Sequence, residues 1–305
     1  KSPILAQYLN PARGYIEEID NTAGHGTHVA GLASYDDEAI GILPVRVLPS
    51  SVTIGPDKDK KKDVIEEDTA VVLDRIYKGI EYSIQKGARV INLSLGGNQE
   101  IEGNEKPSPD YEQLKAFAKK LEELLKANPN VVAVAATGND GKWMDQDSNT
   151  SFPCGVNAPN VLCVGALKAD GKLASFSNIA LRRDANIIYA SGVDIYSTYP
   201  QQMCTTEGKK AFEQSEADKF GEIFLKECVE VLRPKMMKMS GTSMSTPIVA
   251  RMIAKVLLAQ PQFTGKEAID LLMSRTVTTD SVELIVTLNK LKAKAPSWYE
   301  DKFLV

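Results

Sequence analysis

The stretch Ser240-Gly241-Thr242-Ser243-Met244-Ser245-Thr246-Pro247 joins a turn of small residues to an apolar run that begins at Ile248. Small residues around a central serine, followed by a helical pattern, predict that Ser243 lies where a turn enters a helix. At a helix N-terminus, free backbone N–H groups and the positive end of the helix dipole can face a developing negative charge. Pro247 is expected in the first turn, where a missing N–H costs little. The pattern indicates a serine nucleophile, which needs a base.

The two histidines of the chain, His25 and His28, lie together in Gly24-His25-Gly26-Thr27-His28-Val29-Ala30-Gly31. Any imidazole base must therefore come from this one segment. We expect His25 to be the base, at the start of a helix, and His28 to be a structural residue held by hydrogen bonds. A zinc site is disfavoured, because the histidines are three rather than four residues apart and no glutamate lies between them.

A third segment, Ala135-Ala136-Thr137-Gly138-Asn139-Asp140, completes a set of motifs that resembles the subtilisin-like serine proteases. The motifs occur in the family's order, and the resemblance covers nearly the whole chain. It implies that Ser243 attacks a peptide carbonyl, with His25 as general base and then general acid. It also implies that the Asn139 side chain and the Ser243 backbone N–H stabilise the oxyanion. The chain is thus expected to be a serine endopeptidase acting on polypeptide substrates.

The same resemblance implies that an extended substrate backbone pairs with the end of a strand, by β-strand addition. The residues expected to bind substrate are Ser94, Leu95, Gly96, Gly97, Thr137 and Gly138.

The family's triad aspartate, found in an Asp-Ser/Thr-Gly turn some tens of residues before the histidine, has no match here. Only 24 residues precede His25, and Asp20 is expected in a loop. Two explanations stay open. In the first, the sequence begins just downstream of the aspartate strand, which a noncovalently bound N-terminal fragment or pro-segment would supply. In the second, the chain is a catalytically weak pseudoprotease that binds extended peptides in a regulatory role. We prefer the first, because the other catalytic motifs all remain.

Apolar segments and amphipathic helical patterns alternate along most of the chain. We expect buried strands at 41–48, 90–95, 131–136 and 161–167, and helices at 68–87, 109–127 and 261–275. This alternation indicates right-handed βαβ units. The expected fold class is α/β, with a doubly wound, mainly parallel sheet covered by helices on both faces, in three layers α/β/α. We expect one peptidase domain over 1–305, with surface insertions at about 49–67 and 201–238.

The composition limits the classes of partner and cofactor that the chain can be expected to bind. A formal net charge of −4 argues against a nucleic-acid partner. No apolar run approaches the ~20 residues that cross a bilayer, so no membrane span is expected. Calcium is possible by the family resemblance, although no acidic loop has a spacing that identifies a site. No other cofactor is expected.

Four cysteines form an even set without a CxxC pair. The simplest pairing by proximity joins Cys154 to Cys163 and Cys204 to Cys228; the alternative is four reduced, partly buried thiols. Disulfides would favour an oxidising compartment. With the family resemblance, this predicts a secreted or otherwise extracytoplasmic protein.

Overall fold

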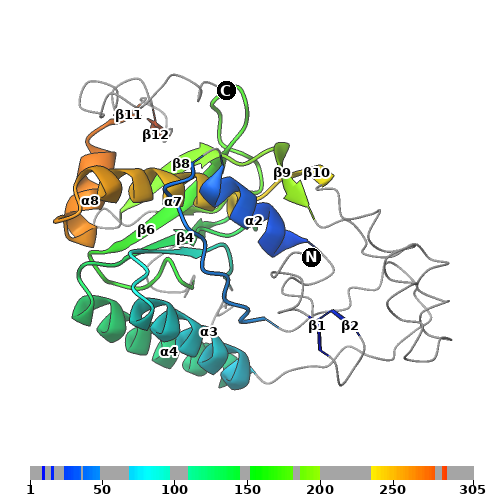
Figure 1. Ribbon diagram of the computed structural model, residues 1–305. Helices are drawn as coiled ribbons and strands as arrows, with labels where there is room; N and C mark the ends of the chain where they lie inside the picture. Colours follow the sequence, from blue (N-terminus) through cyan, green and yellow to red (C-terminus); the bar gives the residue numbers. More distant parts are fainter. Residues whose placement is uncertain are drawn as a thin grey trace, which may run out of the picture. The chain divides into compact units, whose positions relative to one another are not determined.

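Four parallel strands form the centre of the fold, in the order β3-β4-β6-β8 (Figure 1). Their bounds are Val90–Leu93 for β3, Val132–Ala136 for β4, Val161–Leu167 for β6 and Ile187–Ser191 for β8. Beyond β8, β12 (Leu284–Val286) continues the sheet in parallel, and β11 (Thr276–Thr278) pairs antiparallel with β12. The computed structural model describes residues 9–10, 15–16, 24–35, 37–48, 69–96, 109–144, 152–180, 186–199, 235–278 and 284–286.

The central strands are apolar on both faces because helices cover both faces. Along β4, Ala133 and Ala135 belong to one core, whereas Val132 and Val134 belong to the other. This alternation follows from the two-residue period of a strand. Helices α3 (Thr69–Gln85) and α4 (Pro109–Ala127) close the first core, and α7 (Thr242–Ala259) and α8 (Gly265–Met273) close the second (Figure 1). The predicted three-layer α/β/α architecture is confirmed.

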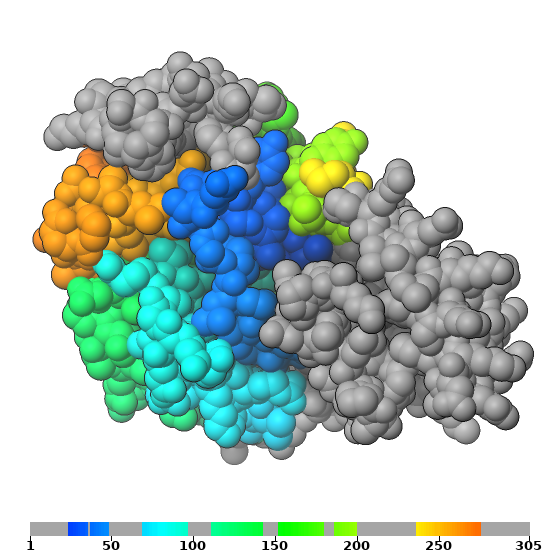
Figure 2. Space-filling model, viewed as in Figure 1, coloured from blue at the N-terminus to red at the C-terminus, as the bar shows by residue number. Residues whose placement is uncertain are grey.

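Each helical layer buries a stripe of side chains at spacings of three and four residues. In α4 the stripe includes Phe117, Leu121 and Leu125, and the two leucines are completely buried. Burial of such a side chain stabilises the fold by about 1.5–3 kcal/mol. The outer surfaces of α3 (cyan) and α8 (orange) remain visible in the space-filling view (Figure 2). These helices were expected from the periodicity of the sequence, and the structure confirms them.

The strand expected at 41–48 is not formed. This segment is extended but belongs to no ladder among the described residues, and Ile42, Leu43 and Leu48 are each more than two-fifths exposed. The Val47 side chain lies against Gly79 of α3. Apolar content alone cannot make a strand, which also needs a neighbouring edge to accept its N–H groups, and Pro44 has none to donate.

The chain falls into two compact units. One comprises 1–28, 49–65 and 197–237, and the other comprises 29–48, 66–196 and 238–305. The six-stranded sheet and helices α3, α4, α7 and α8 belong to the second unit. The first unit includes the pair formed by β1 (Leu9–Asn10) and β2 (Tyr15–Ile16). Three elements cross the boundary: α2 (His25–Ser34), β9 (Ile195–Tyr199) and β10 (Lys235–Met239).

Most of both predicted insertions lies outside the described residues, although the end of the second, up to residue 238, falls within β10. The single-domain assignment stays a prediction. No helix in the described ranges is long and apolar enough to cross a membrane.

Candidate active site

Ser243 is the second residue of α7, as expected for a serine where a turn enters a helix. Two hydrogen bonds fix the preceding turn: the Gly241 N–H donates to the Gly192 carbonyl at 2.8 Å, and the Asp194 N–H donates to Ser240 Oγ at 2.9 Å. A Cβ at Gly192 would lie only 2.9 Å from the Gly241 carbonyl oxygen. The close backbone approach that places the serine turn therefore requires glycine at this position.

The Asn139 side chain caps α7 from another element. Asn139 follows β4, and its Oδ1 accepts hydrogen bonds from Thr242 N at 2.8 Å and Thr242 Oγ1 at 3.0 Å. Because a backbone N–H can only donate, the amide oxygen must face Thr242 and the Nδ2 amino group must turn away. Neither Asn139 Nδ2 nor the Ser243 N–H donates to another residue within the described ranges. Two N–H donors are therefore available at the start of α7.

Pro247 is the sixth residue of α7, counting Thr242 as the first, so its expected place in the first turn is wrong. In a regular helix the residue at 247 would donate its N–H to the carbonyl of Ser243, four residues earlier. Proline has no N–H, so this carbonyl is left without its helical donor. Ser94 Oγ supplies the missing hydrogen bond, at 2.8 Å from the Ser243 oxygen. The proline therefore ties the backbone of the serine to the end of β3.

The Ser243 hydroxyl also faces this strand end. Ser243 Oγ lies 3.4 Å from the Ser94 carbonyl oxygen, to which it can donate a long hydrogen bond. Asn92 Nδ2 donates to Ser94 Oγ at 3.0 Å and so fixes the serine side chain. Ser94, Asn139 and Ser243, three of the predicted site residues, thus meet at the carboxyl ends of β3 and β4. Active sites of parallel α/β sheets lie at this edge.

The other predicted substrate-binding residues that the structure describes lie at the same strand ends. Leu95 and Gly96 follow β3, whereas Thr137 and Gly138 follow β4; Gly97 lies outside the described residues. A Cβ at position 96 would lie 2.6 Å from the Phe152 carbonyl oxygen. The glycine therefore permits a close backbone contact with the loop at Phe152. Its role in substrate binding stays a prediction.

The histidine segment lies at the start of α2, with His25 as its first residue. Inside the first compact unit, the fully buried His28 donates from Nε2 to the Met237 carbonyl at 3.0 Å, and Ser197 Oγ donates to the His28 carbonyl at 2.7 Å. These bonds agree with the structural role expected for His28. His25 belongs to a different unit from the serine, and its assignment as the base stays a prediction.

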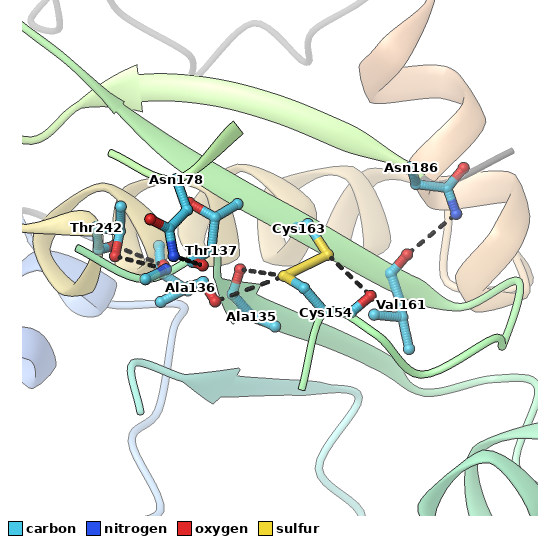
Figure 3. Close-up of a disulfide and its surroundings, with 11 residues drawn as sticks. Ala135, Ala136, Thr137, Cys154, Val161, Cys163, Asn178, Asn186 and Thr242 are labelled. Carbon is cyan, nitrogen blue, oxygen red and sulfur yellow. Dashed lines mark hydrogen bonds between the residues drawn. A yellow bond between two sulfur atoms is a disulfide. The ribbon is translucent and has the colours of Figure 1, made fainter. Parts of the chain in front are cut away.

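A disulfide joins Cys154 and Cys163, as expected from their proximity in the sequence (Figure 3). It links the loop after Phe152 to β6, and the Cys154 sulfur lies 3.5 Å from the carbonyl oxygen of Ala136 in β4. The bridge therefore supports the strand that leads to Asn139. The second expected pair, Cys204 with Cys228, lies outside the described residues.

No metal-binding cluster is found in the part of the chain that the structure describes. No three His, Cys, Asp or Glu side chains gather there in a way that could hold an ion. The structure therefore identifies no ligands for the calcium that the family resemblance raised.

Two side chains that hold the Asn139 loop, Thr242 and Asn178, are not among the predicted site residues. Thr242 adjoins the predicted nucleophile, and its position in the serine motif was a usable signal. Asn178 carries no such signal, because one asparagine in a loop is more often a turn residue than part of a site.

Comparison with known proteins gives consistent matches. A family model described as "Subtilase family" matches residues 6–293. Subtilisin DY of Bacillus licheniformis is 28% identical over 244 residues, which cover 80% of this chain and 67% of the relative. The major intracellular serine protease of Bacillus subtilis (strain 168) is 26% identical over 294 residues, covering 95% of this chain and 74% of the relative. A lanthipeptide protease crystal structure matches with a TM-score of 0.61 at 18% identity, covering 93% of this chain and 78% of that one. At that identity the structural match bears on the fold alone.

Proposed function

The chain belongs to the subtilase family of serine peptidases, and from this premise we propose that it is an endopeptidase that cleaves peptide bonds through an acyl-enzyme. The observation that best supports this proposal is the arrangement around Asn139. Its amide oxygen is held by Thr242, and its amino group and the Ser243 N–H are left as donors. Fixed donors of this kind stabilise the oxyanion of acyl transfer without reorganisation during the reaction.

In the proposed reaction, Ser243 Oγ forms a bond to the carbonyl carbon of the scissile peptide and loses its proton to His25. Negative charge develops on the carbonyl oxygen, where Asn139 Nδ2 and the Ser243 N–H donate to it. The C–N bond then breaks, and His25 returns the proton to the leaving amine. A water molecule then attacks the acyl-enzyme carbonyl with the same proton transfers through His25, which releases the carboxylic acid and restores the Ser243 hydroxyl.

The strand end at Ser94 supports an endopeptidase rather than an esterase role. Ser94, directly after β3, is hydrogen-bonded to Ser243, and this supports the proposal that an extended peptide adds as a strand there. Main-chain hydrogen bonds of this kind favour polypeptide substrates. The sequence has no match to the motif of the triad aspartate, and we propose that a noncovalently bound N-terminal fragment or pro-segment supplies this residue.

Labelling with a fluorophosphonate probe tests the proposal. The probe phosphonylates a serine only when a base activates it, so we expect the natural protein to label rapidly and Ser243→Ala not to label. We expect His25→Ala to slow labelling by about 10³–10⁴-fold, the scale on which a triad base contributes. If the natural protein fails to label but still binds an extended peptide, the endopeptidase proposal is wrong and the pseudoprotease alternative replaces it.

We also propose an extracytoplasmic location. The Cys154–Cys163 bridge supports an oxidising compartment. One relative is named as an intracellular protease, which argues for the other location. Trapping free thiols in the producing cells would decide: alkylated Cys154 and Cys163 would contradict the proposal.

A further inference from the structure

The carboxamide of Asn178 is completely buried and uses all of its hydrogen-bonding capacity. Its Oδ1 accepts from the backbone N–H groups of Asp140 and Lys142, each at 3.0 Å. Its Nδ2 donates to the Thr137 carbonyl and to Asp140 Oδ2, also at 3.0 Å each. An amide group has two donor hydrogens and an oxygen with two lone pairs, so these four bonds satisfy it. Such a fully satisfied buried group rigidifies its surroundings.

The four partner groups belong to Thr137, Asp140 and Lys142, which lie in the loop that carries Asn139, on both sides of it. The Asn178 backbone adds a fifth bond, from its N–H to the Gly138 carbonyl at 3.0 Å. Gly138 has a φ of +101°, and a Cβ there would lie 2.5 Å from Asn178 Nδ2. The loop therefore wraps closely around the Asn178 side chain, and glycine is required for this approach.

The Asn139 side chain itself is oriented from the opposite direction. Thr242 holds its Oδ1, and the Gly138 N–H donates to Thr242 Oγ1 at 3.3 Å. Figure 3 shows Asn178, Thr137 and Thr242 lying near one another at this end of the sheet. The loop continues into β5 (Trp143–Met144), which pairs with β7 (Ile179–Ala180), directly after Asn178. Asn178 thus fixes the backbone under Asn139, and Thr242 fixes the direction of its amide.

We propose that Asn178 is a positioning residue for the oxyanion donor, acting on the reaction only through Asn139. This inference rests on the proposed function for its effect on turnover, but its effect on Asn139 is independent of activity. Loss of Asn178 should affect substrate binding less than turnover, because the other expected binding strand end, at Ser94, is held by Asn92 rather than by Asn178. It should reduce turnover, because a donor displaced by about 1 Å loses about 10²-fold in rate.

Asn160 provides a matched control at the opposite end of the sheet. It is also an asparagine, 1% exposed, and its Nδ2 donates to the carbonyls of Leu125, Asn128 and Val131. It precedes β6, whereas Asn139 follows the carboxyl end of β4. Asn160→Ala therefore removes a similar set of buried hydrogen bonds without contact with the Asn139 loop.

The test compares Asn178→Ala with Asn160→Ala in the natural full-length protein. For Asn178→Ala we expect kcat to fall by about 10- to 100-fold and KM to change by less than about threefold. For Asn160→Ala we expect kcat and KM to stay within about twofold of the parent values. This should hold even if the unfolding midpoint of Asn160→Ala falls as far as that of Asn178→Ala. Adding Asn178→Ala to Asn139→Ala should lower kcat by less than about threefold more, because both changes remove the same donor. If Asn178→Ala does not fold, Asn178→Ser, which keeps one donor and one acceptor, takes its place.

A second readout does not require activity. The side-chain amide signal of Asn139 in a ¹⁵N NMR spectrum, identified by its loss in Asn139→Ala, should shift or broaden in the Asn178 variant and stay unchanged in Asn160→Ala. An unchanged Asn139 signal, or costs of Asn178→Ala and Asn139→Ala that add fully, would overturn the positioning role. A protein without Ser243-dependent activity would instead refute the proposed function, and the NMR comparison would still decide the role of Asn178.

Discussion

The N-termini of α7 and α8 provide acceptors for their first backbone N–H groups in different ways: α8 uses its own side chains, and α7 uses a side chain from a distant part of the chain. In α8, Thr264 Oγ1 accepts from the Glu267 N–H, and Glu267 Oε2 accepts from the Thr264 N–H at 2.8 Å, so the first turn closes on itself. In α7 the N-cap is Gly241, which has no side chain, and the first turn contains no acidic residue. Its cap is the Asn139 side chain, supplied from the loop that follows β4.

This difference explains why one helix end can serve chemistry and the other cannot. The capping box of α8 uses its donors within the turn and places a carboxylate there, which would repel an anion. The remote cap of α7 occupies the Thr242 N–H, and the Ser243 N–H has no acceptor among the residues that the structure describes. A helix start can bind a developing anion only if its own side chains do not satisfy it first.

Asn139→Asp would make the start of α7 resemble that of α8, and we expect the largest effect from it. The carboxylate keeps an oxygen that can accept from Thr242 N, and its charge suits the helix dipole, so stability should hold or rise by about 0.3–1 kcal/mol. It removes the Nδ2 donor and places negative charge where the oxyanion forms. We therefore expect kcat to fall by at least about 10²–10³-fold; this range comes from loss of such a donor in subtilisin itself.

Turnover on a peptide substrate and the thermal midpoint would be measured together for this variant. Thr264→Asp is the matched control, because it puts an aspartate at the α8 cap, and its turnover should equal that of the parent. Retention of activity by Asn139→Asp would show that the amide does not act as an oxyanion donor. Loss of stability instead would show that Oδ1 is not the cap.

The second prediction concerns the Ser243 carbonyl, which Pro247 deprives of its helical donor, a feature absent from α8. Ser94→Ala should lower the free energy of unfolding by about 1–3 kcal/mol, because the Ser243 carbonyl then loses its donor. In a Pro247→Ala background the new N–H can restore the helical bond, so the same Ser94→Ala change should cost less. Urea unfolding of the four proteins in this cycle gives the coupling directly. Additive costs would contradict the proposed link between the proline and Ser94.

The sequence predicted those features that depend on local pattern. The pattern of apolar residues located α3, α4 and three of the four central strands, β3, β4 and β6, whereas β8 was not predicted. The proximity of Cys154 and Cys163 predicted their disulfide. The strand predicted at 41–48 was wrong: the segment has the apolar content of a buried strand but has no ladder partner among the described residues. Pattern does not say which edge a strand will find.

The site was predicted only in part, for a related reason. Ser243 and Asn139 were recognised from motifs, but the contacts that orient them join residues far apart in the chain. Thr242 and Asn139 are separated by 103 positions, and Ser94 and Ser243 by 149. No local signal marks Asn178, whose four partners become neighbours only after the sheet has formed. By contrast, the capping box of α8 is readable in Thr264-Gly265-Lys266-Glu267, because all of its donors and acceptors lie within one turn.

The smallest expected effect concerns the charge of Glu267 in the capping box of α8. Hydrogen bonds from the Thr264 backbone N–H and then from its hydroxyl lower the pKa of Glu267 below its usual value. A carboxylate whose pKa is lower in the folded state contributes stability above its unfolded-state pKa and loses it as the pH falls through the folded-state pKa. Glu267→Gln, which keeps an amide oxygen acceptor without the charge, should therefore be less stable than the parent at neutral pH. The gap should be present at neutral pH and should close at an acidic pH below the folded-state pKa of Glu267, where the parent side chain is protonated.

Urea unfolding of both proteins at the two pH values measures this gap, and turnover at neutral pH should not change. Glu123→Gln on α4 is the control, because it removes an exposed carboxylate outside the first turn of its helix and should show no comparable closing of the gap. If the difference between Glu267→Gln and the parent is the same at both pH values, the charge is not what closes the α8 turn. The contrast with α7 would then rest on hydrogen-bond geometry alone, and the acidic repulsion assigned to α8 would have to be dropped.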